Sequence, residues 1–243
     1  MRLRLSAPAL LVLASAHALA AQQPRVTVTL TGGQQWNSAL FDHTASFSTQ
    51  DQQLRLAKSV RVPRATMAGA RVAARVAGPW LVYADVAHGS ARMSYVDDAR
   101  AILENGTVLA QLQEATRDAR ITSVGVGVGR GVMLPHGLPE LELTLGGAVQ
   151  RFGIDRLQHC EPGPCSTDPW QSSYTVPSAR GGLTLRQAVT PRLGLELRSA
   201  YTIGRIDNES LNHRLAPGFA AYEAPGHQTL RTGEASLGLW IRP

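Results

Sequence analysis

The chain lacks several features that would place it in a common class of protein. Its 243 residues include two cysteines, one lysine (Lys58) and only 5% aromatic residues. No run of about 18 apolar residues occurs, which excludes a protein that crosses a membrane with several helices. Glycine (23 residues) and proline (14 residues) are too frequent for an all-helical bundle. With 44% hydrophobic and 17% charged residues, the chain is expected to form one folded, mainly β domain.

The positive charge is not arranged as in a nucleic-acid-binding protein. The chain has 24 Lys+Arg against 18 Asp+Glu, a formal net charge of +6. The arginines are scattered singly between acidic and apolar residues, whereas a nucleic-acid footprint is a cluster or a stripe of basic residues. We therefore expect no nucleic-acid partner.

The first 20 residues are typical of a secretory signal peptide. Two arginines precede a short apolar run over residues 5–13, and Ala18 and Ala20 form an A-x-A cleavage site before Ala21. The run is too short for a membrane helix, and the proline within it disfavours the alternative of a buried N-terminal helix. Cleavage after Ala20 would leave residues 21–243 as a single mature domain.

Export changes the interpretation of the two cysteines. Cys160 and Cys165 flank Glu-Pro-Gly-Pro, a spacer that favours a turn. In an oxidising compartment this spacing predicts a small disulfide ring within a loop. The alternative is a metal site that includes His159, but too few other ligands lie nearby in the sequence. We expect neither a metal nor a cofactor.

Eight segments alternate apolar and polar residues with period two, the pattern of strands whose faces meet different environments. In one of them Val124, Val126 and Val128 alternate with glycines. The segments cover residues 26–31, 66–77, 80–86, 124–129, 141–150, 180–186, 193–203 and 234–241.

Short and long links alternate between these segments. The short links are residues 78–79, 134–139 and 190–191, and the long ones are 34–63, 95–115, 153–173 and 206–227. This alternation is typical of a closed antiparallel barrel whose termini lie on one side. The fold class is therefore expected to be an all-β, eight-stranded, up-and-down barrel with three short turns and four long loops.

The link over residues 95–115 allows two interpretations. Asn105-Gly106 is a strong hairpin signal, and it favours two strands that continue beyond the barrel as a protruding hairpin. The alternative is a short helix over residues 101–113.

Period two does not decide which face of each strand lines the interior. The polar faces are rich in glycine, which suits a crowded lumen better than a solvated surface. They also carry charges of both signs, which could pair when enclosed. Trp80 follows a short turn and Trp240 lies near the C-terminus, where membrane-interface aromatics are expected, although Trp240 falls on the polar face. Together these features favour a transmembrane barrel over a soluble one.

A transmembrane barrel would enclose the charged faces. A static plug of salt bridges is favoured over a gate for small solutes, because an eight-stranded barrel is only wide enough for its side chains to fill. The candidate lumen network comprises Arg71, Arg75, Asp85, Glu142, Arg180, Arg186, Glu196, Arg198 and Glu234.

The chain resembles the small outer-membrane β-barrels of Gram-negative bacteria, the group of the OmpA transmembrane domain, OmpX and OmpW. The resemblance lies in the eight alternating segments, the pattern of links and the amphipathic segment 232–241. The resemblance implies a monomer in the outer membrane that contacts lipid, lipopolysaccharide and the outer-membrane assembly machinery. It also implies a structural or surface-interaction role, with an extracellular ligand that the loops do not identify. A narrow passive pore and a soluble periplasmic lipid-binding barrel are alternatives.

Some barrels of this size are enzymes that act on lipid. Asp85, His88 and Ser90 lie close together, and His-x-Ser is similar to a motif of the lipid A deacylase barrels. His88 and Ser90 share one strand face, however, and Asp85 belongs to the other. The sequence thus predicts a protein without catalytic residues, and a lipid-modifying enzyme remains the alternative.

Overall fold

The computed structural model describes residues 26–48, 52–133, 139–154, 158–159, 166–167, 172–208, 211 and 226–243. Their strands are β1 (Val26–Asn37), β2 (Phe41–Ser48), β3 (Gln52–Arg61), β4 (Arg64–Ala77), β5 (Trp80–Leu103), β6 (Val108–Met133), β7 (Glu140–Ile154), β8 (Gln158–His159), β9 (Ser166–Thr167), β10 (Ser172–Ala188), β11 (Leu193–Asp207) and β12 (His227–Ile241). Within these ranges no helix is both long and apolar enough to span a membrane.

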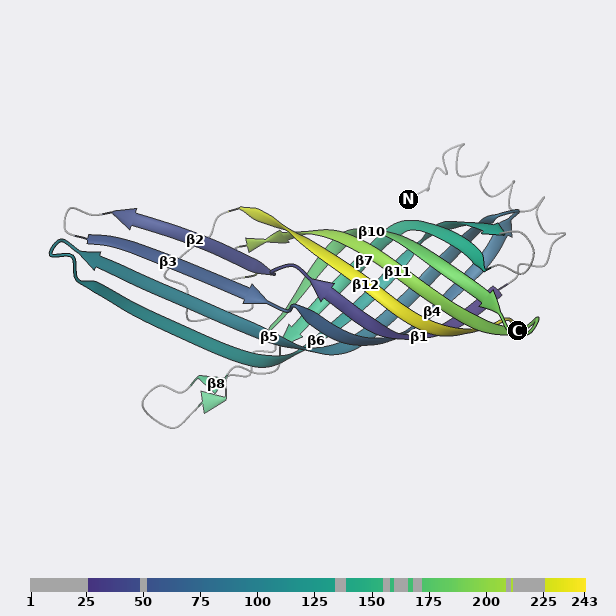
Figure 1. The fold of residues 1–243 in the computed structure, drawn as a ribbon, viewed down its shortest axis with the longest axis horizontal. Coiled ribbons are helices and arrows are strands. Elements are labelled where there is room, and N and C mark those ends of the chain that lie inside the picture. The colour runs from purple at the N-terminus through teal and green to yellow at the C-terminus, as the bar shows by residue number, and fades with distance from the viewer. Residues whose placement is uncertain are drawn as a thin grey trace, which may run out of the picture.

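Eight of the strands close into a barrel. Around the ring they follow the order β1-β4-β5-β6-β7-β10-β11-β12, and β12 pairs antiparallel with β1. Each of the eight alternating segments of the sequence lies in one of these strands, so the predicted fold class is confirmed. Figure 1 shows the tilted strands crossing around a common axis.

The short links lie at one end of the barrel, which we call the turn end. Gly78-Pro79 joins β4 to β5, and Gly78 adopts a φ of +51°, which glycine tolerates without steric cost. Residues 189–192 join β10 to β11, where Leu193 N donates to Thr190 Oγ1 at 3.0 Å. The link between β6 and β7 falls mostly outside the described residues.

The opposite end, the hairpin end, extends into a sheet of its own. Strands β5 and β6 continue past the barrel to a turn at Asn105-Gly106, where Gly106 has a φ of +79°. The hairpin prediction is therefore confirmed, and the alternative helix over 101–113 is wrong. Strands β2 and β3 come from a link that was expected to be a long polar loop. β2 pairs with β3, and β3 pairs with β5. The four strands lie side by side in the order β2-β3-β5-β6, at the left of Figure 1.

The barrel has polar residues inside and apolar residues outside. On β12, Glu234 and Ser236 face inward, while Leu237 and Leu239 are 68% and 55% exposed on the outer surface. On β6, Val126 is 58% exposed, whereas the intervening glycines face the lumen. This inverted polarity is typical of a barrel surrounded by lipid.

Candidate functional site

Among the described residues, the ion-pair network of the lumen contains equal numbers of positive and negative side chains. All nine residues of the predicted network point inward and take part in ion pairs, together with Glu140, which the sequence reasoning had not included. Five arginines therefore face five carboxylates. Glu140 could have been found, because it shares the strand face of Glu142 on β7. Equal numbers matter because an unpaired charge in such an enclosed space would be strongly destabilising.

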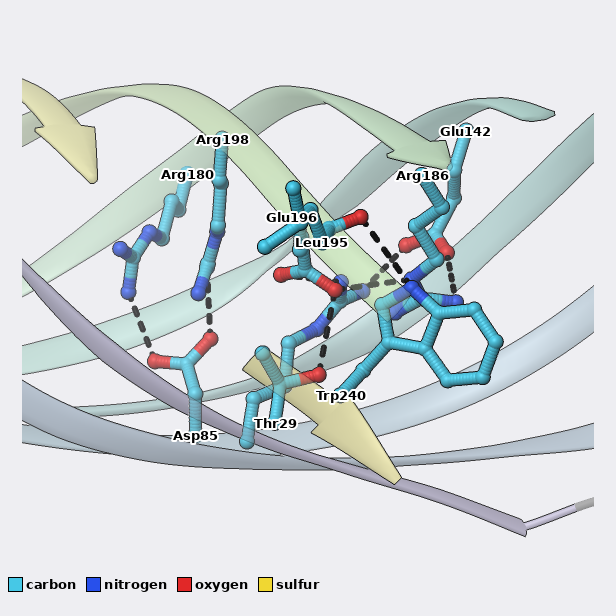
Figure 2. A network of polar contacts seen from close by, with 10 residues as sticks. Thr29, Asp85, Glu142, Arg180, Arg186, Leu195, Glu196, Arg198 and Trp240 are labelled. Atoms are coloured by element: carbon cyan, nitrogen blue, oxygen red, sulfur yellow. Dashed lines mark hydrogen bonds and ion pairs between the residues drawn. The ribbon is translucent and has the colours of Figure 1, made fainter. Parts of the chain in front are cut away.

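One cluster of the lumen network lies toward the turn end. Glu196 on β11 accepts from Arg186 Nε at 2.8 Å and from Thr29 Oγ1 at 3.1 Å. Arg186 Nη1 also lies 2.9 Å from Glu142 Oε2, and Arg71 donates to the other oxygen of Glu142. Arg71 and both glutamates are at most 1% exposed. The cluster connects β1, β4, β7, β10 and β11 through the interior (Figure 2).

A second cluster surrounds Asp85 on β5. Its two oxygens accept separately, Oδ1 from Arg180 Nη1 at 2.8 Å and Oδ2 from Arg198 Nη2 at 2.7 Å. Arg180 also donates to Glu234 on β12. Figure 2 shows Asp85, Arg180 and Arg198 apart from the cluster around Glu196. Each oxygen of Asp85 thus has its own guanidinium, which satisfies the buried carboxylate.

A third pair lies at the turn end itself. Arg75 on β4 donates to Glu140 on β7, and their side chains are 29% and 13% exposed. A cavity of about 70 Å³ lies beside them, lined by Thr27, Arg186 and Arg242 among others. This volume is enough for a few water molecules but not for an organic solute.

Glycines on the lumen face make room for large side chains. A Cβ at Gly127 or Gly146 would lie 2.8 or 2.9 Å from atoms of Tyr83, whose ring is 4.7 Å from Arg71 Cζ. A Cβ at Gly125 would lie 2.9 Å from Asp85 Oδ1. Gly125, Gly127 and Gly146 therefore leave the space that Asp85 and Tyr83 occupy in a crowded lumen.

The two tryptophans that were expected at a membrane interface lie in different environments. Trp80 is 52% exposed on the outer surface at the turn end, with Arg130 Cζ 5.8 Å from its ring. Trp240 is 1% exposed and lies inside the barrel, where its Nε1 donates to Leu195 O at 3.1 Å. The assignment of Trp240 to the interface is therefore wrong. Its place on the polar strand face directs it inward, and Gly194 on the neighbouring strand leaves space for its ring.

An apolar cluster at the hairpin end was not foreseen. Most of its sixteen buried members come from the barrel strands other than β1, and others come from β2, β3 and the residues beside them. Leu40, Val62 and Ile121 are completely buried, and Phe152 is 1% exposed. These residues share the strand faces of the charged residues, so period two alone could not separate them from the polar lumen. We call this group the apolar plug.

The candidate triad does not assemble. Asp85 is buried in the lumen, whereas His88 and Ser90 are exposed on the outer surface. His88 Nδ1 forms a hydrogen bond with Thr122 Oγ1 at 2.9 Å instead. Among the described residues no group of three or more His, Cys, Asp or Glu could hold a metal ion.

Several predicted sites lie outside the described residues. They are Ala18, Ala20 and Ala21 of the cleavage site, and Cys160 and Cys165 of the expected disulfide. Cleavage and disulfide formation stay predictions.

Comparison with solved structures places the fold among outer-membrane barrels. OprG from Pseudomonas aeruginosa matches with a TM-score of 0.51 and 11% identity, over 91% of this chain and 97% of that chain. Neisserial surface protein A gives 0.49 and 12%, over 91% and 100%. Ail of Yersinia pestis, solved with the heparin analogue sucrose octasulfate, gives 0.41 and 10%, over 90% and 100%. No protein-family model and no curated protein matches the chain. At such identities the likeness extends to the fold alone.

Proposed function

We propose that this chain is exported by a cleaved signal peptide and inserts as a monomer into a bacterial outer membrane. The apolar outer surface supports this placement. Residues 231–241 of β12, tilted by about 40°, span about 25 Å along the barrel axis, which is the height of the apolar band of such barrels. Because the short turns of these barrels are periplasmic, the turn end would face the periplasm and the hairpin end the exterior. Insertion would require the outer-membrane assembly machinery.

The lumen would be a permanent plug. The two buried clusters join strands that are not neighbours in the sheet, so they fasten the wall of the barrel together from inside. The apolar plug closes the hairpin end above them. Two seals of different chemistry would both have to open for a solute to pass. This arrangement supports a static role and disfavours the narrow pore.

The function would then reside in the sheet formed by β2, β3 and the outer ends of β5 and β6, which we call the protruding sheet. The observation that carries this proposal is that this sheet extends beyond a closed barrel. Among the described strands, β2 pairs with β3 alone, so one side of β2 offers its backbone groups at the edge of the sheet. An exposed edge can accept an additional strand from another protein. Phe47, Leu109 and Leu112 add exposed apolar surface near the tip. We propose that this sheet binds an extended segment of an extracellular protein.

Enzymatic activity is not part of this proposal. His88 and Ser90 face outward, away from Asp85. These three residues therefore do not form a triad, in which the nucleophile, the base and the orienting acid contact one another. Paired charged side chains fill the polar interior, so the described part of the barrel leaves no space there for a lipid substrate.

Display at the cell surface can be tested by cysteine labelling in intact cells. In a background with Cys160→Ser and Cys165→Ser, we expect Ser46→Cys on β2 to react with a membrane-impermeant maleimide. Thr190→Cys in a short turn should react only after the outer membrane is opened. Equal labelling of both positions in intact cells would contradict the proposed orientation. Folding of each variant is checked by the mobility of unboiled and boiled samples in SDS gels, since a folded barrel migrates differently before heating.

A further inference from the structure

Six arginines from six different strands form a girdle around the outside of the barrel. All are exposed, and each is directly followed or preceded by a residue of the apolar plug. They therefore lie at one height, at the hairpin end of the apolar outer surface. The girdle consists of Arg64, Arg92, Arg120, Arg151, Arg205 and Arg231.

Few acidic residues balance the girdle. Asp118 and Asp207 are the outward-facing carboxylates at this height among the described residues of the barrel strands. Between the girdle and the turn end, the outer face of β12 carries only Gly233, Ala235, Leu237, Leu239 and Ile241. A ring of arginine at the edge of an apolar band matches the level at which lipid headgroups meet the acyl chains.

Two members of the girdle are close enough to act together. Arg205 on β11 pairs with Thr229, and Arg231 on β12 pairs with Ile203. The two arginines are thus diagonal neighbours on the same outer face, within reach of long side chains. Two arginines at such diagonal positions can both reach the oxygens of one phosphate, which guanidinium groups bind well.

The surface beside this pair is hollowed. A depression of about 640 Å³ lies over β10, β11 and β12, lined by Arg205, His227, Thr229, Ile203, Ala179 and Pro177. Its polar residues lie toward the hairpin end, and Ile203 and Ala179 lie nearer the apolar band. Asp207 is also close, with its Oδ2 3.7 Å from His227 Nδ1. A headgroup could therefore rest on the basic residues while an acyl chain follows the apolar ones.

We infer that Arg205 and Arg231 bind a phosphate of an outer-leaflet glycolipid, with the depression over β10–β12 holding the adjoining part of the same molecule. The other four arginines of the girdle attract phosphates around the rest of the barrel. This inference rests on the proposed placement in the outer membrane. It concerns a lipid-facing site that is separate from the protruding sheet.

The test is a binding measurement on the full mature chain in detergent micelles, with diphosphoryl lipid A as the probe and native mass spectrometry as the readout. The variant Arg205→Gln/Arg231→Gln should bind at least tenfold more weakly. The matched control is Arg55→Gln/Arg100→Gln, which removes the same charge from a cross-strand pair of exposed arginines on the protruding sheet. This control should bind like the unchanged protein.

Three outcomes would overturn the inference. They are equal binding by the two double variants, equal binding of lipid A after removal of its phosphates, and displacement of lipid A by inorganic phosphate at the same concentration. The last outcome would mean that a free anion is recognised and not a lipid. A gel-mobility measurement on each sample separates these outcomes from failure of the membrane placement, because an unfolded sample shows no shift on boiling.

Discussion

Arg198 on β11 donates a hydrogen bond to Asp85 on β5 at 2.7 Å, although the two strands lie on opposite sides of the barrel. The pair is 113 residues apart in the chain and is almost completely buried. Such a bridge across the full width of the lumen can form only when the ring is closed. It therefore ties the stability of the lumen network to the closure of the barrel.

The substitution Asp85→Asn should strongly destabilise the barrel. It leaves the guanidinium of Arg198 without its hydrogen-bonded counter-charge and leaves Arg180 paired with Glu234 alone. Removal of one partner of a buried ion pair typically costs about 3–5 kcal/mol. The measurement is the free energy of unfolding in urea, with the protein in lipid vesicles. The control Asp42→Asn breaks the exposed pair with Arg61, at 3.2 Å, and should change this free energy by less than about 1 kcal/mol. Similar losses from both substitutions would contradict the central role of Asp85.

The substitution Glu196→Gln should not open a conducting path. It removes one charge beside Arg186, but the apolar plug still closes the hairpin end. We expect the unchanged protein and the variant to show no channel currents in planar bilayers. Regular single-channel currents from the variant alone would favour a gated narrow pore over the static plug.

The substitution Gly194→Ala should lower the free energy of unfolding, because the added Cβ would collide with the ring of Trp240 and with Gln187 O. A cost of about 1–3 kcal/mol is typical of overpacking. The control is Gly233→Ala, where an added Cβ would meet no atom within 4 Å. Because glycine is unfavourable within a strand, this control should be neutral or slightly stabilising. Tryptophan fluorescence follows both unfolding transitions.

Shortening the β2–β3 hairpin should leave the barrel intact. His43 and Lys58 are cross-strand partners, so replacement of residues 44–57 by Asn-Gly would close the hairpin with a two-residue turn. The eight-stranded ring does not include β2 or β3. We expect the shift in gel mobility on boiling to persist and surface labelling on this hairpin to be lost with the removed residues. Loss of the mobility shift would show that the hairpin is needed to fold the barrel.

Much of the architecture could be read from local pattern. The alternation of Val126 with its neighbouring glycines assigned a strand and its two faces, and Asn105-Gly106 located a turn. His88 and Ser90 share one strand face and Asp85 belongs to the other, which argued against a triad. This conclusion needs no tertiary structure, because successive side chains of any strand point to opposite sides. Inward-facing charges could be named in the same way.

Other features depend on the closed ring. Asp85 pairs with Arg198, and Arg71 with Glu142, only because the tilt and stagger of the strands bring distant positions to one height. Ile121 and Phe152 belong to the apolar plug, and not to a charged layer, because of their height on the inward face. The alternation of apolar and polar residues does not reveal how far along the barrel axis a residue lies. The sequence by itself determined which residues share one face of a strand. The tertiary structure decided which of the inward-facing residues meet, because contacts across a lumen depend on ring closure and not on neighbours in the chain.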